Sequence, residues 1–235
     1  MSRRTNYFTR LMLALRMLCF ALLFSALSVN FVASLKVAHF EESPSGSEIS
    51  SLILSNSSEV PLPDIFILCT SHQQSRMDNK GFYHIYGEDG QPWMSTHFET
   101  VSGTHNSVGL WGTFGGMWIY FGKITEPKLF FWYHICQKVD TSQGRISVSV
   151  NGHQRATNIS AENLKRNKPR VLGGRIVVGK ATQVSTTKDP IDQQFLGSVS
   201  NVNIFSAGNL SIEVLSSNNT CNVEGDVLPW SSAFW

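Results

Sequence analysis

The chain has 235 residues, enough for one or two domains with a full hydrophobic core. Only 15% of the residues are charged and 11% are aromatic, which suits an all-β domain with large apolar faces. Beyond residues 1–34, which hold four arginines and no acid, there are 15 basic and 17 acidic residues, so no basic excess is available for nucleic acid or an anionic membrane.

The N-terminal segment has the layout of a signal peptide. Four arginines precede an uncharged run from Met17 to Leu35, and small residues at 32–34 offer a cleavage site after Ser34. An uncleaved anchor is the alternative, because this run is just long enough to span a bilayer. In both cases we expect the rest of the chain to be extracellular, either secreted or membrane-anchored. We expect residues 1–34 to be the leader, 35–46 a linker and 47–235 one domain.

An oxidising compartment agrees with the sequons and the cysteines. Four Asn-x-Ser/Thr sequons lie in polar stretches, at Asn56, Asn158, Asn209 and Asn218, and predict a glycoprotein. Cys69, Cys136 and Cys221 lie beyond the leader. Cys69 and Cys136 each close a strand with a buried pattern, so they are the better disulfide pair. Cys221 is then free or intermolecular.

The first half of the chain predicts short strands separated by turns. We expect strands at 51–54, at 65–69, and at 82–86 and 93–98 with a hairpin turn at 87–90 that carries two acids. Residues 73–80 are expected to be a polar loop. Five glycines and five aromatic residues share 109–122, where bending strands would place the aromatic side chains in the core. The alternative interpretation is an aromatic platform for a ligand such as a sugar.

The middle of the chain has the clearest hairpin signals. The apolar run Leu129–Cys136 predicts a strand that is buried on both faces. Turn-forming residues follow at 140–144, and alternation over 146–150 predicts a half-buried strand. Asn151-Gly152 is the strongest two-residue hairpin signal, because both positions must take a positive φ.

The last third of the chain predicts two more strands and one helical turn. Residues 158–170 are expected to be a solvated polar loop, 175–179 a strand, and 180–192 a long polar loop. The parity of apolar residues slips within 195–205, which a β-bulge near Ser200-Asn201 would explain. A helical turn at 211–215 would be capped by Asn209 or Ser211. Together these patterns predict a single antiparallel β-sandwich.

These residues resemble the pentraxins from about Ser47 to Trp235. The resemblance rests on residues 65–69 ending at Cys69, His134-Ile-Cys136, Gly144, Val150-Asn-Gly152, residues 176–179, 195–197, 202–204 and Gly225-Asp-Val-Leu-Pro-Trp230. Cys69 and Cys136 have a spacing close to that of the pentraxin disulfide. The signature around His134 is half met, because Lys138 and Val139 replace its Ser/Thr and Trp. The resemblance implies a jelly roll of the concanavalin type, which laminin-G-like domains share, and a secreted, calcium-binding, lectin-like protein that forms ring oligomers.

The resemblance also implies a calcium site, which this chain keeps only in part. Ala181, Gln183 and Pro190 fall where the family has acidic ligands, whereas Gln193 matches a ligand glutamine. One Ca²⁺ held by Asp89, Asp189, Asp192 and Gln193 would satisfy the oxygen preference of the ion. Solvated loop acids are the alternative.

Two functions follow from these residues. The first is a secreted recognition protein that binds phosphorylated or glycan ligands at a loop face, as an oligomer whose weak sites gain avidity. The alternative is a calcium-independent adhesion or structural module that binds protein, including as the ectodomain of a larger membrane protein. We expect no enzyme, because no strand carries two acids at i and i+2 and no catalytic motif is present.

Overall fold

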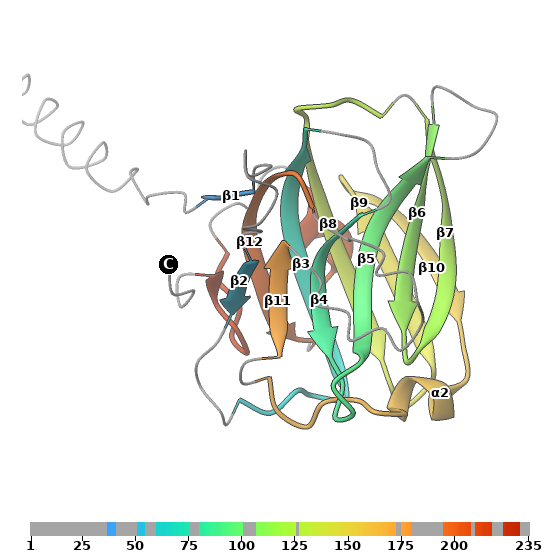
Figure 1. Cartoon of the computed structure of the whole chain (residues 1–235). Helices are drawn as coiled ribbons and strands as arrows, with labels where there is room; N and C mark the ends of the chain where they lie inside the picture. Colours follow the sequence, from blue (N-terminus) through green and yellow to red (C-terminus); the bar gives the residue numbers. More distant parts are fainter. Residues whose placement is uncertain are drawn as a thin grey trace, which may run out of the picture. The chain divides into compact units, whose positions relative to one another are not determined.

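Two six-stranded antiparallel sheets form a β-sandwich in the computed structural model of the chain (Figure 1). The structure describes residues 37–40, 51–54, 60–75, 80–100, 107–125, 127–172, 175–179, 195–207, 210–217 and 223–230. The sandwich confirms the predicted fold class.

The first sheet, here called sheet A, has the strand order β1-β12-β3-β8-β9-β10. Its strands are β1 (Val37–Phe40), β12 (Gly197–Ser206), β3 (Ile65–Gln74), β8 (Trp132–Asp140), β9 (Arg145–Val150) and β10 (His153–Asn158). Sheet B has the order β2-β11-β4-β5-β6-β7. Its strands are β2 (Ser51–Leu54), β11 (Ile176–Gly179), β4 (Lys80–Tyr86), β5 (Pro92–Thr100), β6 (Ser107–Phe114) and β7 (Met117–Thr125).

The core lies between the sheets and is rich in aromatic rings. Alternate residues of each strand point inward, as the period of 2 requires. His72 is fully buried among these rings, stacked on Phe82 at a centroid distance of 4.0 Å and close to Phe98 and Phe195. A polar triad of Tyr83, Thr96 and Gln137 joins the two sheets inside this core through hydrogen bonds.

Several local predictions are confirmed. Asn151 and Gly152 have φ values of 48° and 83° and close the β9–β10 hairpin with two residues. The register of β12 on β3 shifts between Ser200 and Asn203, and Asn201 has a φ of 52°, which is the predicted bulge. The helical turn is α3 (Ile212–Ser216), and Ser211 is its N-cap, accepting a hydrogen bond from Val214 N at 3.4 Å.

The buried strand predicted at 129–136 is wrong in its first half. Strand β8 begins only at Trp132, and Leu129, Phe130 and Phe131 are 45%, 67% and 43% exposed. Phe130 has a φ of 57° and is held there by two contacts with β3: its N donates to Gln74 O at 2.9 Å, and its O accepts from Gln73 Nε2 at 2.7 Å. The apolar run therefore divides into an exposed loop tip and a buried strand.

Three segments predicted as loop or linker have regular structure. Val37–Phe40, inside the predicted linker, form β1 and pair with β12. Strand β3 continues to Gln74, beyond the predicted end at Cys69. The polar stretch 158–170 contains the short helix α2 (Ala161–Lys165), whose Leu164 is fully buried, so this stretch is anchored rather than only solvated.

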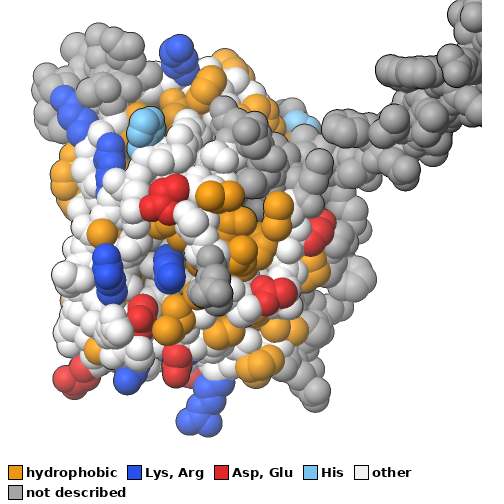
Figure 2. All heavy atoms as spheres, turned by 180° about the vertical axis from the view of Figure 1, so that it is seen from behind, with side chains coloured by type: hydrophobic (Ala, Val, Ile, Leu, Met, Phe, Trp, Pro, Cys, Tyr) orange, Lys and Arg blue, Asp and Glu red, His pale blue; other side chains and the backbone are white. Residues whose placement is uncertain are grey.

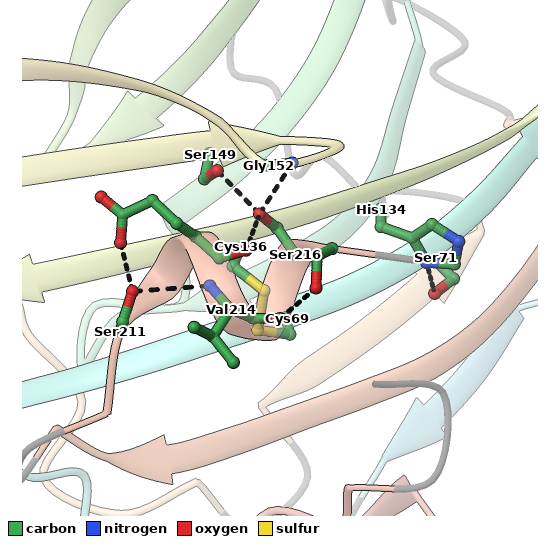
Figure 3. The surroundings of a disulfide bond; sticks show 11 residues. Cys69, Ser71, His134, Cys136, Ser149, Gly152, Ser211, Val214 and Ser216 are labelled. Atoms are coloured by element: carbon green, nitrogen blue, oxygen red, sulfur yellow. Dashed lines mark hydrogen bonds between the residues drawn. A yellow bond between two sulfur atoms is a disulfide. The ribbon is translucent and has the colours of Figure 1, made fainter. Parts of the chain in front are cut away.

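Helix α3 covers the outer face of sheet A over the predicted disulfide (Figure 3). Cys69 and Cys136 are directly paired residues of β3 and β8, with a Cα–Cα distance of 4.1 Å, and form the disulfide. Ser216 of α3 donates to Ser149 Oγ at 2.7 Å and accepts from Gly152 N at 3.1 Å. Because of this cover, β9 is buried on both faces and not half-buried as predicted.

Candidate functional site

The outer face of sheet B carries a group of aromatic and histidine side chains that we call the aromatic face. Strand register brings them into two cross-strand rows: His84, Ser95, Thr113 and Trp118 in one, and His97, Trp111 and Tyr120 in the other. Side chains of one row stand next to those of the other because they are two residues apart on each strand.

Two of these aromatic side chains are open to solvent. Trp118 is 60% exposed and Tyr120 is 47% exposed, on the edge strand β7. The His97 ring meets the Trp118 ring edge-on at a centroid distance of 4.9 Å, and the Trp111 and Tyr120 rings lie 4.8 Å apart. The two exposed rings are therefore held in position by their neighbours on the adjacent strands.

The absence of a side chain at Gly109 leaves space for the Trp111 ring. A Cβ at this position would lie 2.6 Å from Trp111 Nε1 and 3.0 Å from Tyr120 Cε2. Trp111 therefore lies along the sheet over Gly109, beside Tyr120. A side chain at this position would displace the Trp111 ring from the aromatic face.

The polar groups of this face are neutral near pH 7. Burial lowers the pKa of His84 to about 4, with a smaller effect of His97, and burial also lowers the pKa of His97 to about 4. Neither ring nitrogen of His84 has a hydrogen-bond partner among the described residues. Ser95 is also buried here. The face thus combines exposed rings with buried, uncharged polar groups beside them.

The aromatic stretch 109–122 divides between the core and the surface, so the core interpretation is confirmed for part of it and the ligand platform stays a prediction. Phe114, Ile119 and Phe121 point inward and are buried in the core. Trp118 and Tyr120, at alternate positions of β7, point outward. Sequence reasoning favoured the core for the whole stretch, although the alternation Trp118, Tyr120 against Ile119, Phe121 was the signal that separates the two faces. Sequence reasoning did not identify His84 and His97 as residues of this face.

The predicted calcium ligands are not brought together in the described part of the chain. Asp189, Asp192 and Gln193 lie outside the described residues. Asp89 lies in the β4–β5 turn, where its two carboxylate oxygens accept from Gln91 N at 3.0 Å and from Asn167 Nδ2 at 2.5 Å. Within the described ranges, no three His, Cys, Asp or Glu side chains cluster as a metal site would require.

The other acid of this turn serves a structural role. Glu88 forms an ion pair with Arg175 at 3.0 Å and accepts from Arg170 N at 2.7 Å. Together with the Asp89–Asn167 contact, this pair fixes the β4–β5 turn to the segment that follows α2. Neither Glu88 nor Asp89 is arranged as one of two facing catalytic carboxylates.

The remaining predicted residues have mixed outcomes. The Cys69–Cys136 disulfide is confirmed. Asn158 is the exposed last residue of β10, which a glycan acceptor requires, while Asn56, Asn209, Asn218 and Cys221 lie outside the described residues. Their modification stays a prediction.

His134 lies near the disulfide and contacts Ser71 (Figure 3). Its Nδ1 is 2.7 Å from Ser71 Oγ, and its backbone N donates to Asn151 Oδ1 at 2.8 Å. The hollow that Ser71 and His134 line has a volume of about 20 Å³. That is room for about one water molecule.

None of the helices in the described ranges has the length and hydrophobicity that a bilayer crossing needs. No protein-family model matches the sequence, and no curated protein does.

Solved structures, in contrast, share the fold. A heptameric pentraxin similar to serum amyloid P component, from Limulus polyphemus, is 15% identical over 78% of this chain and 88% of its own, with a TM-score of 0.60. The extracellular region of zebrafish Gpr126/Adgrg6 is 20% identical over 85% of this chain, with a TM-score of 0.59, but the match spans only 25% of that protein. A protein described as carbohydrate-binding, from Bacteroides ovatus, is 15% identical over 81% of this chain and 47% of its own, with a TM-score of 0.50. At these identities the likeness shows only that the chain shares the sandwich fold of these proteins.

Proposed function

We propose that the chain is an extracellular recognition module that binds a neutral carbohydrate on its aromatic face. The observation that carries the proposal is the pair of exposed rings, Trp118 and Tyr120, fixed side by side by Trp111 and His97. The pentraxin-like fold and the similar carbohydrate-binding protein from Bacteroides ovatus support it.

The chemistry of this face suits a sugar. The C–H groups on one side of a pyranose ring pack well on the electron-rich face of an indole or phenol ring. The polar groups beside the rings, His84, His97 and Ser95, are buried and uncharged, so the exposed indole and phenol rings supply the contact surface. With no charged side chain in the two rows, an uncharged ligand fits best. This proposal moves the ligand from the predicted loop face to a sheet face.

Replacing Trp118 should weaken sugar binding strongly. In a screen of neutral glycans, Trp118→Ala is expected to reduce the affinity for any bound glycan about 10- to 30-fold, because it removes a stacking surface at the centre of the site. Stability should change little, since the ring is 60% exposed. Trp118→Phe should keep part of the affinity. The measurement is the Kd by titration calorimetry.

Phe130→Ala is the matched control for this titration. Phe130 is also an exposed aromatic residue, at 67%, but it lies in the β7–β8 loop and not on the aromatic face. Its replacement should leave the Kd unchanged. An unchanged Kd for Trp118→Ala, or an equal loss for both variants, would contradict the proposed site.

The calcium prediction has a separate test. A Ca²⁺ ion bound only to the folded chain by Asp89, Asp189, Asp192 and Gln193 would stabilise it by about 2.7 kcal/mol at a hundredfold excess over Kd. For a domain of this size, that raises Tm by roughly 5–10 °C in millimolar Ca²⁺ relative to EDTA. The expected shift should disappear in Asp192→Asn. Equal melting temperatures in the two buffers would remove calcium from the account without affecting the aromatic face.

A protein-binding adhesion module is the second candidate, favoured by the β7–β8 loop. Leu129, Phe130 and Phe131 are adjacent and exposed there, with Lys128 beside them, and the loop is held by hydrogen bonds to β3. Exposed apolar groups of this kind often mark interaction sites. The fold shared with the Gpr126/Adgrg6 extracellular region supports this candidate. Loss of cell or protein binding in Phe130→Ala, with sugar binding intact, would favour it.

A further inference from the structure

A groove lies on the side of the sandwich opposite the aromatic face, on the outer face of sheet A. It has a volume of about 290 Å³ and is lined by Lys138, Asp140, Gln143, Arg145, Ser147 and Gln154. At about 30 Å³ for each water molecule in the liquid, it holds roughly ten. In Figure 2, which shows this side, Lys and Arg side chains stand beside the hydrophobic side chains that gather in the middle.

Strand register explains why two cations share the groove. Lys138 of β8 is paired with Ser147 of β9, and Asp140 is paired with Arg145, so the two cations are diagonal neighbours on one face. Long side chains reach each other across such a diagonal. Neither Lys138 nor Arg145 makes an ion pair with an acid among the described residues, where the ion pairs are Lys168–Asp64 and Arg175–Glu88.

The acids nearest the groove are occupied by their own turns. Asp140 Oδ1 accepts from Ser142 N at 2.9 Å, from Ser142 Oγ at 2.5 Å and from Gln143 N at 2.9 Å. Glu213 of α3 accepts from the hydroxyl of Ser211. The negative charges of Asp140 and Glu213 attract Lys138, but neither carboxylate bonds to it directly. The ammonium group of Lys138 can therefore donate hydrogen bonds to a ligand.

The hydroxyl group of Ser147 lines the groove. Ser147 is only 6% exposed, and its hydroxyl makes no hydrogen bond with another described residue. A hydroxyl that lines a groove and has no protein partner can donate to or accept from water or a ligand. The exposed amides of Gln143 and Gln154 complete the rim.

We propose that this groove binds the oxyanion of a sulfate or phosphate monoester, independently of the aromatic face. The three non-ester oxygens of such a group can accept from Arg145 and Lys138 at the sides and from Ser147 on the floor. Charge-assisted hydrogen bonds to Arg and Lys are the strong ones, and the planar guanidinium of Arg145 matches two oxygens of the group.

The test is a titration of the full chain with a heparin tetrasaccharide, with its desulfated form as the reference. Arg145→Gln and Lys138→Gln should each weaken binding about tenfold, and Ser147→Ala about threefold or more. Glu213→Gln should strengthen binding about two- to threefold, because it removes a negative charge near Lys138. Inorganic phosphate is added as a competitor to test whether the groove also binds a phosphate group. The binding of either oxyanion, sulfate or phosphate, must depend on Arg145.

Arg166→Gln is the matched control, because Arg166 is an exposed cation outside the groove. Asn158→Gln is titrated alongside and should retain binding; it removes any glycan that would stand next to Arg145, its partner on β9. Binding of a neutral glycan to Arg145→Gln should be unaltered, which separates this site from the aromatic face. Unchanged heparin affinity in the Lys138→Gln/Arg145→Gln double variant, or an equal loss in Arg166→Gln, would overturn the proposal.

Discussion

The folded chain is expected to lose stability steeply between pH 6.5 and pH 4, by about 4 kcal/mol per pH unit. Burial lowers the pKa of His72 to about 3 and those of His84 and His97 to about 4. In the unfolded chain each of them titrates near 6.5. Below that pH these three histidines are protonated in the unfolded state but not in the folded state. Each of them lowers the free energy of unfolding by about 1.4 kcal/mol per pH unit.

The sign follows from the direction of the shift. Because the folded pKa values are depressed, the full stability is present above about pH 6.5, where the histidines are neutral in both states. It is lost progressively as the pH falls towards 4. By pH 5 the three shifts together remove about 6 kcal/mol, so a domain at the lower end of the typical stability range of about 5–15 kcal/mol should unfold in mild acid, near pH 5. The carboxyl groups of Asp64, Asp140, Glu213 and Asp226, whose pKa values are lowered, add to this loss only at lower pH, below about 4.

The variant His72→Phe isolates one of the three contributions. His72 is stacked on Phe82, and its two ring nitrogens have no partner in the described part of the chain, so a phenyl ring loses no hydrogen bond there. The pH slope of the unfolding free energy, measured by urea denaturation at pH 7, 6 and 5, should fall by about one third. His153→Gln, at an exposed position on β10, should leave the slope as it is. Equal slopes for all three chains would show that the buried histidines do not control acid stability.

Removing the disulfide should cost about 4 kcal/mol. The bond joins residues 67 positions apart, and in the chain-entropy model the closure of such a loop restricts the unfolded chain by about this amount. Cys69→Ala/Cys136→Ala should therefore lower Tm by roughly 8–16 °C at neutral pH. Its effect on the sandwich should be global, because β3 and β8 lie in the middle of sheet A.

Reductant gives the control for this variant. Dithiothreitol should lower Tm of the wild-type chain towards the value of the double variant and leave the double variant itself unchanged. A loss of less than about 1 kcal/mol on removing both cysteines would mean that the pairing of β3 with β8 alone fixes this part of the sheet.

The sequence predicted those parts of the fold that depend on local backbone requirements. Asn151-Gly152 and the parity slip near Ser200-Asn201 were readable because each demands an unusual φ or an extra residue at a defined place. The disulfide was readable because Cys69 and Cys136 each end an apolar run of the sequence, although both strands continue beyond the cysteines in the structure. These signals can be recognised without knowing which distant parts of the sequence lie nearby in the folded structure.

The failures come from neighbours that a linear pattern does not show. The run Leu129–Phe131 has the composition of a buried strand, yet the hydrogen bonds of Phe130 with Gln73 and Gln74 turn it outward. Strand β10 is polar because it is an exposed edge strand, so no hydrophobic alternation marks it. The aromatic face combines three strands of sheet B, and only their register places Trp111 beside Tyr120 and His97 beside Trp118.

The most direct test of the aromatic face is an NMR titration of the six tryptophan indole N–H signals with a neutral glycan selected by the screen. The signals of Trp118 and its neighbour Trp111 should shift on binding. Trp93 is the internal reference, because its Nε1 is buried and donates to Leu164 O at 3.0 Å, so its signal should stay in place. Shifts confined to other residues, with Trp118 unmoved at saturation, would contradict carbohydrate recognition by this face.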